Sequence, residues 1–145
     1  MINNPYSRGA VLLAVLLLAS GCAQVVKDTR PAEELVAERA DARWAALIDG
    51  QWQQAYDLLT PGYRSATSFD SYRMNLLTRK INWTAAKTTA VTCESSEKCT
   101  ARVKIDYALV GGLPGVSRVT SSANAEETWL RLDGQWLHLP NKTGR

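Results

Sequence analysis

The sequence has little of the chemistry from which most active sites are built. Its 145 residues include one histidine, one phenylalanine and three cysteines. It contains no glycine-rich phosphate loop, no Gly-x-Ser-x-Gly nucleophile motif and no His-Glu-x-x-His zinc motif. These absences exclude the enzyme classes that depend on such motifs. They leave few groups from which another kind of active site could be assembled.

Positive charge is not concentrated anywhere in the chain. The net charge is +3 at pH 7, and it falls to roughly +2 without residues 1–21, which carry Arg8. Lysine and arginine are interspersed with aspartate and glutamate. Binding to nucleic acid therefore has no support. The length of the chain predicts a single folded domain.

A hydrophobic run long enough to span a bilayer is also missing, but a shorter run lies near the start. Residues 10–19, AVLLAVLLLA, are apolar, whereas a spanning helix takes about 20 residues. This length suits the hydrophobic core of a secretory signal. The run leads into Leu18-Ala19-Ser20-Gly21-Cys22, which resembles a bacterial lipobox. An ordinary signal peptide with a chance cysteine is the alternative.

The lipobox resemblance implies that Cys22 carries the lipid anchor of the mature protein. In such proteins the thiol receives a diacylglycerol, the leader is cleaved before the cysteine, and the new amine is acylated, with palmitate among the chains. Residues 1–21 would then be the signal peptide, residues 22–30 a lipidated tether and residues 31–145 the folded domain. Several acyl chains anchor a protein firmly, because each buried CH₂ contributes about 0.8 kcal/mol.

The residue after the lipobox cysteine bears on the location of the protein. Residue 23 is alanine and not aspartate, which by resemblance to the enterobacterial sorting rule favours the outer membrane. We therefore expect a lipid-anchored protein of the bacterial cell envelope, facing the periplasm. We expect it to bind the membrane through its lipid anchor.

The first part of the domain carries two apolar stripes at helical spacing. Gly50 can end the first helix in the left-handed conformation, and Pro61 prevents the second from continuing. The sequence predicts a helical hairpin, with the tryptophans of both stripes largely buried. Residues 67–70 resemble a capping box and predict a third helix that ends near Thr78. The stripe residues are Val36, Ala40, Trp44, Leu47 and Ile48, then Trp52, Ala55, Tyr56 and Leu59.

The remaining chain has the period of two that is typical of strands. We expect strands over residues 82–93, 99–110 and 116–132, with a bulge or bend at residues 121–124. Residues 128–139 predict a hairpin about Asp133-Gly134. The predicted fold class is α+β, with N-terminal helices packed on the concave side of a curved antiparallel sheet of about four strands.

Cys93 and Cys99 flank a polar loop. In an oxidising compartment a disulfide between them is the favoured interpretation, and it would stabilise the fold by roughly 2 kcal/mol. A metal pair or a redox pair is the alternative. Two thiols without a nearby histidine do not complete a zinc site, and the spacing is not that of dithiol oxidoreductases.

The terminal hairpin carries the candidate ligand-binding residues. Pairing about its turn places Trp129, Arg131, Trp136 and His138 on one face, and Leu130, Leu132, Leu137 and Leu139 on the other. Tyr107, on a preceding strand, joins the candidate set. Packing of His138 and covering of an aromatic ring by Arg131 are the simpler interpretations. Catalysis would require a carboxylate beside the histidine, for which Asp106 is the candidate.

Two segments carry a resemblance to a known superfamily. With WAALIDGQWQQAYDLLTPGYR and ETWLRLDGQWLHLP, residues 31–140 resemble the NTF2-like (cystatin-like α+β cone) superfamily, and most of all its small bacterial lipoproteins. That superfamily contains isomerases, dehydratases, polyketide cyclases and many non-catalytic binding or assembly modules. No catalytic set of the family can be placed on this sequence.

The resemblance implies a non-catalytic domain that binds a small apolar ligand or an envelope protein partner through the cone or its rim. We expect no catalytic residues, no metal and no cofactor. The oligomeric state stays open, a dimer included. The alternative is a small isomerase- or dehydratase-type enzyme that uses His138 and Asp106.

Overall fold

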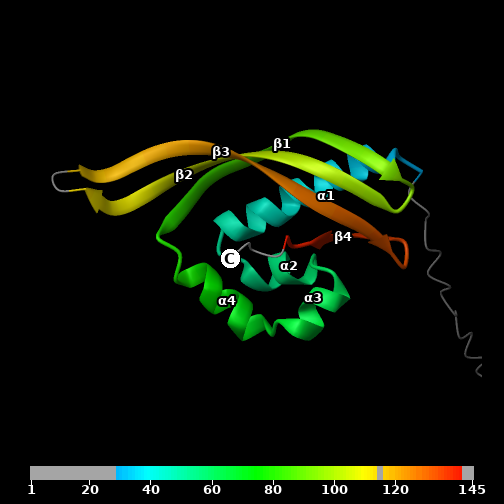
Figure 1. Cartoon of the computed structure of the whole chain (residues 1–145), viewed down its shortest axis with the longest axis horizontal. Helices are drawn as coiled ribbons and strands as arrows, with labels where there is room; N and C mark the ends of the chain where they lie inside the picture. Colours follow the sequence, from blue (N-terminus) through cyan, green and yellow to red (C-terminus); the bar gives the residue numbers. More distant parts are fainter. Residues whose placement is uncertain (1–28, 114–115, 142–145) are drawn as a thin grey trace, which may run out of the picture.

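A computed structural model describes residues 29–113 and 116–141, in which helices precede a four-stranded antiparallel sheet (Figure 1). The predicted signal peptide, Cys22 and residues 23–28 of the tether lie outside the described residues. The predicted α+β fold is confirmed, since the helices lie beneath one face of a curved sheet. None of the described helices has the length and hydrophobicity to cross a membrane. The helices are α1 (Ala32–Ile48), α2 (Trp52–Asp57), α3 (Pro61–Ala66) and α4 (Phe69–Leu77).

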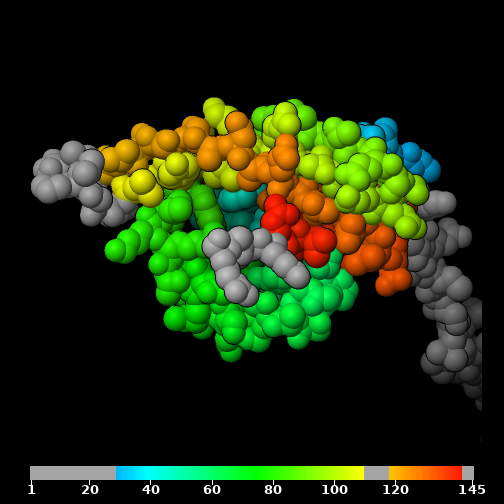
Figure 2. All heavy atoms as spheres, viewed as in Figure 1, coloured from blue at the N-terminus to red at the C-terminus, as the bar shows by residue number. Residues whose placement is uncertain are grey.

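The strands follow one another in the sheet in the order in which they occur in the chain. Figure 2 shows the sheet and the helices as two layers, with the last strand, in red, between them. The long strands bow over α1, and the β2–β3 hairpin extends beyond the helices (Figure 1). The strands are β1 (Ile81–Ser95), β2 (Lys98–Leu113), β3 (Val116–Leu132) and β4 (Gln135–Leu139).

Helix α1 is attached to the sheet by its apolar stripe and by one carboxylate. Val36, Ala40 and Leu47 are buried beneath the strands. On the flank of the helix, Asp41 accepts a hydrogen bond from the Thr88 N–H of β1 at 2.8 Å and another from Lys87. Burial alone would raise the pKa of Asp41, but these bonds outweigh it and hold the pKa below its usual value.

The short helices differ from the sequence expectations in three places. Trp52 is only half-buried, because it stands at the start of α2 beside Gly50 and packs against the outside of the core. Helix α2 ends at Asp57, before it reaches Pro61, and Pro61 instead begins α3, where its missing N–H is not needed. Helix α4 is capped by Ser68, one residue later than predicted, through a bond that its hydroxyl accepts from the Ser71 N–H.

The bulge predicted at residues 121–124 is wrong. These residues pair one to one with β2, without a shift in register. They are exposed, so their small polar side chains reflect an uncovered surface and not an irregular backbone. One register shift lies near the end of β2, at Val110/Leu113, and the others lie in β1, at Trp83/Ala85, Thr88/Ala90 and Cys93/Ser95. Bulges there increase the local twist of the strand that lies over α1.

The β1–β2 and β3–β4 hairpin connections lie at the same end of the sheet, away from the connection between β2 and β3. Cys93 and Cys99 face each other across the β1–β2 hairpin and form a disulfide. In the β3–β4 hairpin, Asp133 and Gly134 have φ values of 50° and 78°, as a two-residue type I′ turn requires.

The outer edge of β4 is occupied by the connection between α2 and α3. The His138 N–H donates to the Leu58 carbonyl at 2.8 Å, and the Thr60 N–H donates to the His138 carbonyl at 2.9 Å. An unpaired strand edge invites pairing with other chains. Here the connection covers that edge at His138 and ties the helical layer to the sheet.

Candidate functional site

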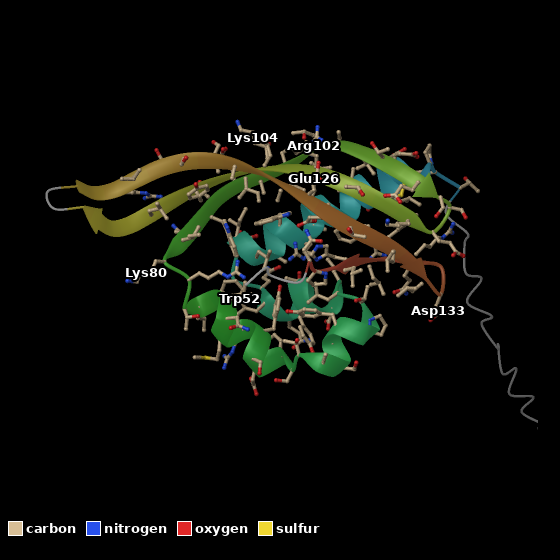
Figure 3. The ribbon with its side chains drawn as sticks, in the orientation of Figure 1. Trp52, Lys80, Arg102, Lys104, Glu126 and Asp133 are labelled. Carbon is tan, nitrogen blue, oxygen red and sulfur yellow. A yellow bond between two sulfur atoms is a disulfide. The ribbon has the colours of Figure 1, made fainter. Side chains whose placement is uncertain are left out.

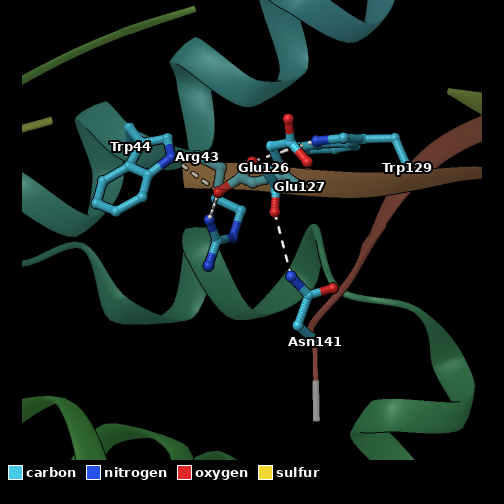
Figure 4. Close-up of polar contacts among 6 residues, drawn as sticks. All are labelled: Arg43, Trp44, Glu126, Glu127, Trp129 and Asn141. Atoms are coloured by element: carbon cyan, nitrogen blue, oxygen red, sulfur yellow. Dashed lines mark hydrogen bonds and ion pairs between the residues drawn. The ribbon is translucent and has the colours of Figure 1, made fainter. Parts of the chain in front are cut away.

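A buried ionic network lies between α1 and the sheet (Figure 4). Glu127 of β3 is only 4% exposed. Its carboxylate accepts hydrogen bonds from Arg43 at 2.7 Å, from the Trp44 indole at 2.8 Å and from the Trp129 indole at 3.2 Å. Three donors thus surround one buried negative charge, which satisfies most of its hydrogen-bonding capacity.

Local periodicity places these groups where they meet. Helical spacing puts Arg43 on the same face of α1 as Ala40 and Leu47. Strand alternation points Glu127 inward and its neighbour Glu126 outward. Glu126 instead pairs with Arg102 at 3.0 Å across the exposed face of the sheet (Figure 3).

Beside this network is a pocket of about 490 Å³, here called the α1–α4 pocket. It lies between α1, α4, the beginning of β1 and the chain that follows β4. This volume falls in the range of small-molecule binding sites. Its lining residues include Arg43, Trp44, Tyr72, Leu76, Arg79 and Trp83.

Two polar atoms of residues in one wall of the pocket are enclosed and lack hydrogen-bond partners. Tyr72 is 6% exposed, and its hydroxyl has no hydrogen-bond partner among the described residues; nor does the Nε of Arg43. Burial raises the pKa of Tyr72, although the charges of Arg43 and Arg79 act in the opposite direction. The contact of Arg43 with the hydroxyl falls short of hydrogen-bond geometry. The hydroxyl is therefore a protonated, unused donor at neutral pH.

The opposite wall is aromatic and carries a cation at its rim. The rings of Trp44 and Trp83 meet edge to face, with centroids 5.3 Å apart. The exposed guanidinium of Arg79 lies 5.8 Å from the centroid of the Trp83 ring, within cation–π range. Among the ion pairs of the described residues, none involves Arg79.

The five candidate residues from the sequence do not form one site. Trp129, Trp136 and His138 are all buried in the core, and the Trp129 and His138 rings lie 5.5 Å apart. Arg131 is half-buried opposite Trp136. None of these four residues lines the α1–α4 pocket. They share one face, as predicted, but that face packs against the helices.

Tyr107 lies far from the hairpin. It pairs with Ser121 on β3, eight positions from Trp129, which corresponds to roughly 25 Å along the strand. The residue that it faces on β1 is Trp83. Tyr107 and the hairpin residues therefore cannot contact one small ligand together.

The proposed acid–base pair is not formed either. Asp106 accepts a hydrogen bond from Ser122 on the exposed face of the sheet, whereas His138 pairs with Trp129 inside. Seven positions of β3 separate Ser122 from Trp129, roughly 20 Å along the strand. In addition, burial and the charge of Arg43 lower the pKa of His138 to about 2. The histidine is therefore neutral at physiological pH and a poor base.

The groups that line the pocket were not identified from the sequence, although two signals pointed to the network beside it. Arg43 is a charge within an apolar helical stripe, and Glu127 is a carboxylate two residues before a buried tryptophan on the same strand face. Each needs a buried partner of opposite charge. Arg79 and Trp83 carried no comparable signal. The described residues contain no cluster of three His, Cys, Asp or Glu side chains suited to a metal ion.

The depressed pKa of His138 predicts a loss of stability in mild acid. An unfolded histidine has a pKa of about 6.5, so between that value and about 2 the unfolded chain binds one more proton than the folded chain. The free energy of unfolding should fall by about 2 kcal/mol from about pH 7.5 to about pH 5. Urea denaturation of the wild type and His138→Gln measures this. Equal pH dependence in both proteins would contradict the assignment.

Comparisons with known proteins reveal similarity at the level of fold. No family model matches the chain, and no curated protein matches it significantly. A SEC-C motif containing protein from Rhodopseudomonas palustris is 14% identical, with a TM-score of 0.53 over 68% of this chain and 70% of that one.

Two further structures are less similar. A putative calcium/calmodulin-dependent protein kinase II association domain from Xanthomonas campestris is 17% identical, with a TM-score of 0.49 over 75% of this chain and 87% of that one. The intermembrane space region of the chloroplast protein ARC6 is 12% identical, with a TM-score of 0.35 over 69% and 93%. At 14% identity, the similarity to the Rhodopseudomonas protein concerns the fold alone. The TM-scores of the other two structures are lower, so no conclusion is drawn from them.

Proposed function

We propose that this chain is a lipid-anchored protein of the bacterial cell envelope whose domain binds a small molecule in the α1–α4 pocket without transforming it. The observation that carries the binding proposal is a pocket of about 490 Å³ that is lined by two indole rings and two arginines. One of these arginines, Arg79, has no ion-pair partner among the described residues. Apolar walls with a few convergent polar groups are usual in small-molecule sites.

The non-catalytic character of the proposal follows from the groups available. The one histidine lies outside the pocket, and its lowered pKa makes it a weak base. The charged side chains among the lining residues are both arginines, which bind and orient but do not exchange protons near neutral pH. Binding is therefore the activity that these residues support best. Membership of the NTF2-like superfamily stays a prediction, as does an envelope protein partner.

The envelope location rests on the sequence. Cys22 follows a secretory leader and small residues, and it lies outside the described residues. The folded domain begins with α1 at Ala32, so a tether of a few residues would hold the pocket close to the membrane surface. An outer-membrane position facing the periplasm is part of the proposal.

The pocket is tested by filling it. Leu76 lines the α1–α4 pocket, whereas its neighbour Leu77 is 55% exposed and does not. We expect a library of small acids, amines and neutral molecules to yield binders in saturation-transfer NMR. Leu76→Trp should abolish their binding, and Leu77→Trp should leave it unchanged. Absence of any binder, or equal binding to both variants, would contradict a ligand function for the pocket.

The anchor is tested separately in cells that produce the full chain. The wild type should fractionate with membranes and yield an acylated peptide that begins at Cys22, as seen by mass spectrometry. Cys22→Ser removes the thiol that accepts the diacylglycerol, so it should lack the modification and leave the membrane fraction. Wild-type protein recovered in soluble form with an unmodified Cys22 would reject the anchor.

A further inference from the structure

We infer that the ligand of the α1–α4 pocket is a small organic monocarboxylate with a flat apolar body, held by Arg79. This inference rests on the proposed binding function and specifies its ligand class. It is carried by the charge, the hydrogen-bond donors and the shape of the pocket.

The charge of the pocket favours an anion that carries a single charge. Arg43 and Arg79 are the charged residues among those that line it, and no lining residue is acidic. The charge of Arg43 is balanced by Glu127 at 2.7 Å. Arg79, in contrast, has no ion-pair partner among the described residues. One positive charge therefore remains to be balanced, which matches a monoanion better than a dianion.

The donors favour a carboxylate. Arg79 presents a planar guanidinium, which matches the two oxygens of a carboxylate in geometry. Hydrogen bonds that involve an ionised partner are about twice as strong as neutral ones. A carboxylate could thus satisfy Arg79, whereas a carboxamide would leave the charge of Arg79 unbalanced.

The walls favour an apolar body of limited size. Trp44 and Trp83 stand at an interplanar angle of 87°, and Leu47 and Leu76 complete the apolar lining. A flat group could pack against one indole face and meet the edge of the other. Such contacts add about 0.5–1.5 kcal/mol beyond burial of area. An amine in the same place would be repelled by Arg79.

The test uses matched probes on the folded domain. Benzoate, phenylacetate and 3-phenylpropionate are compared with their carboxamides and with the corresponding amines by isothermal titration calorimetry. We expect the best carboxylate to bind about tenfold more tightly than its amide and the amine not to bind. Added salt should weaken carboxylate binding, because Arg79 is exposed.

Substitutions in α4 and just after it show which residue causes the preference for a carboxylate. Arg79→Gln should lower carboxylate affinity about tenfold and leave amide affinity unchanged. Arg73→Gln is the matched control, since Arg73 pairs with Asp70 and does not line the pocket; it should bind as the wild type does.

The outcomes separate this inference from the function on which it rests. Amides or amines that bind as well as acids, or a preference for acids that survives Arg79→Gln, would overturn the monocarboxylate but leave a ligand-binding pocket. The same conclusion would follow if no carboxylate bound, while other molecules bound the wild type but not Leu76→Trp. If no molecule binds in a manner sensitive to Leu76→Trp, both the inference and the proposed function fail.

Discussion

A single buried carboxylate constrains how the two layers of this protein meet. Glu127 points from β3 toward α1, and its charge is surrounded by Arg43, Trp44 and Trp129. An unpaired charge at that depth would cost several kcal/mol. The helix must therefore lie where Arg43 and the Trp44 indole both reach the same oxygen. Apolar packing alone would permit α1 to slide or rotate at much smaller cost, because hydrophobic burial is not directional.

The position of α1 in turn shapes the pocket. Arg43 and Trp44 belong both to the network and to the pocket lining. The same two side chains thus fix the helix and present a charge and an aromatic edge to the cavity. On the other side of the fold, the hydrogen bonds of Leu58 and Thr60 to the backbone of His138 hold the helical layer against β4. The pocket borders the first attachment through Arg43 and Trp44, and it is also lined by Pro140 and Asn141, which follow β4.

The sequence contains the local features of this fold, but it does not show which distant segments come together. Helical and strand periods, the glycine after α1 and the Asp133-Gly134 turn were sufficient for the architecture and for the shared face of Trp129 and His138. Whether that face contacts a ligand or the core depends on which segment covers it. A local sequence pattern does not contain that information. The pocket combines residues from α1, α4 and β1 that are distant in the chain, so no spacing could reveal it.

The central claim, that the pair of Arg43 and Glu127 fixes the helix to the sheet, is tested most directly by double-mutant cycles. Arg43→Met, Glu127→Met and the double variant are compared by urea denaturation, with Arg102→Met, Glu126→Met and their double variant as the cycle for the exposed pair that joins β2 and β3. The account predicts a coupling energy of about 2–3 kcal/mol for the buried pair and less than about 1 kcal/mol for the exposed pair. Equal coupling energies in the two cycles would contradict it.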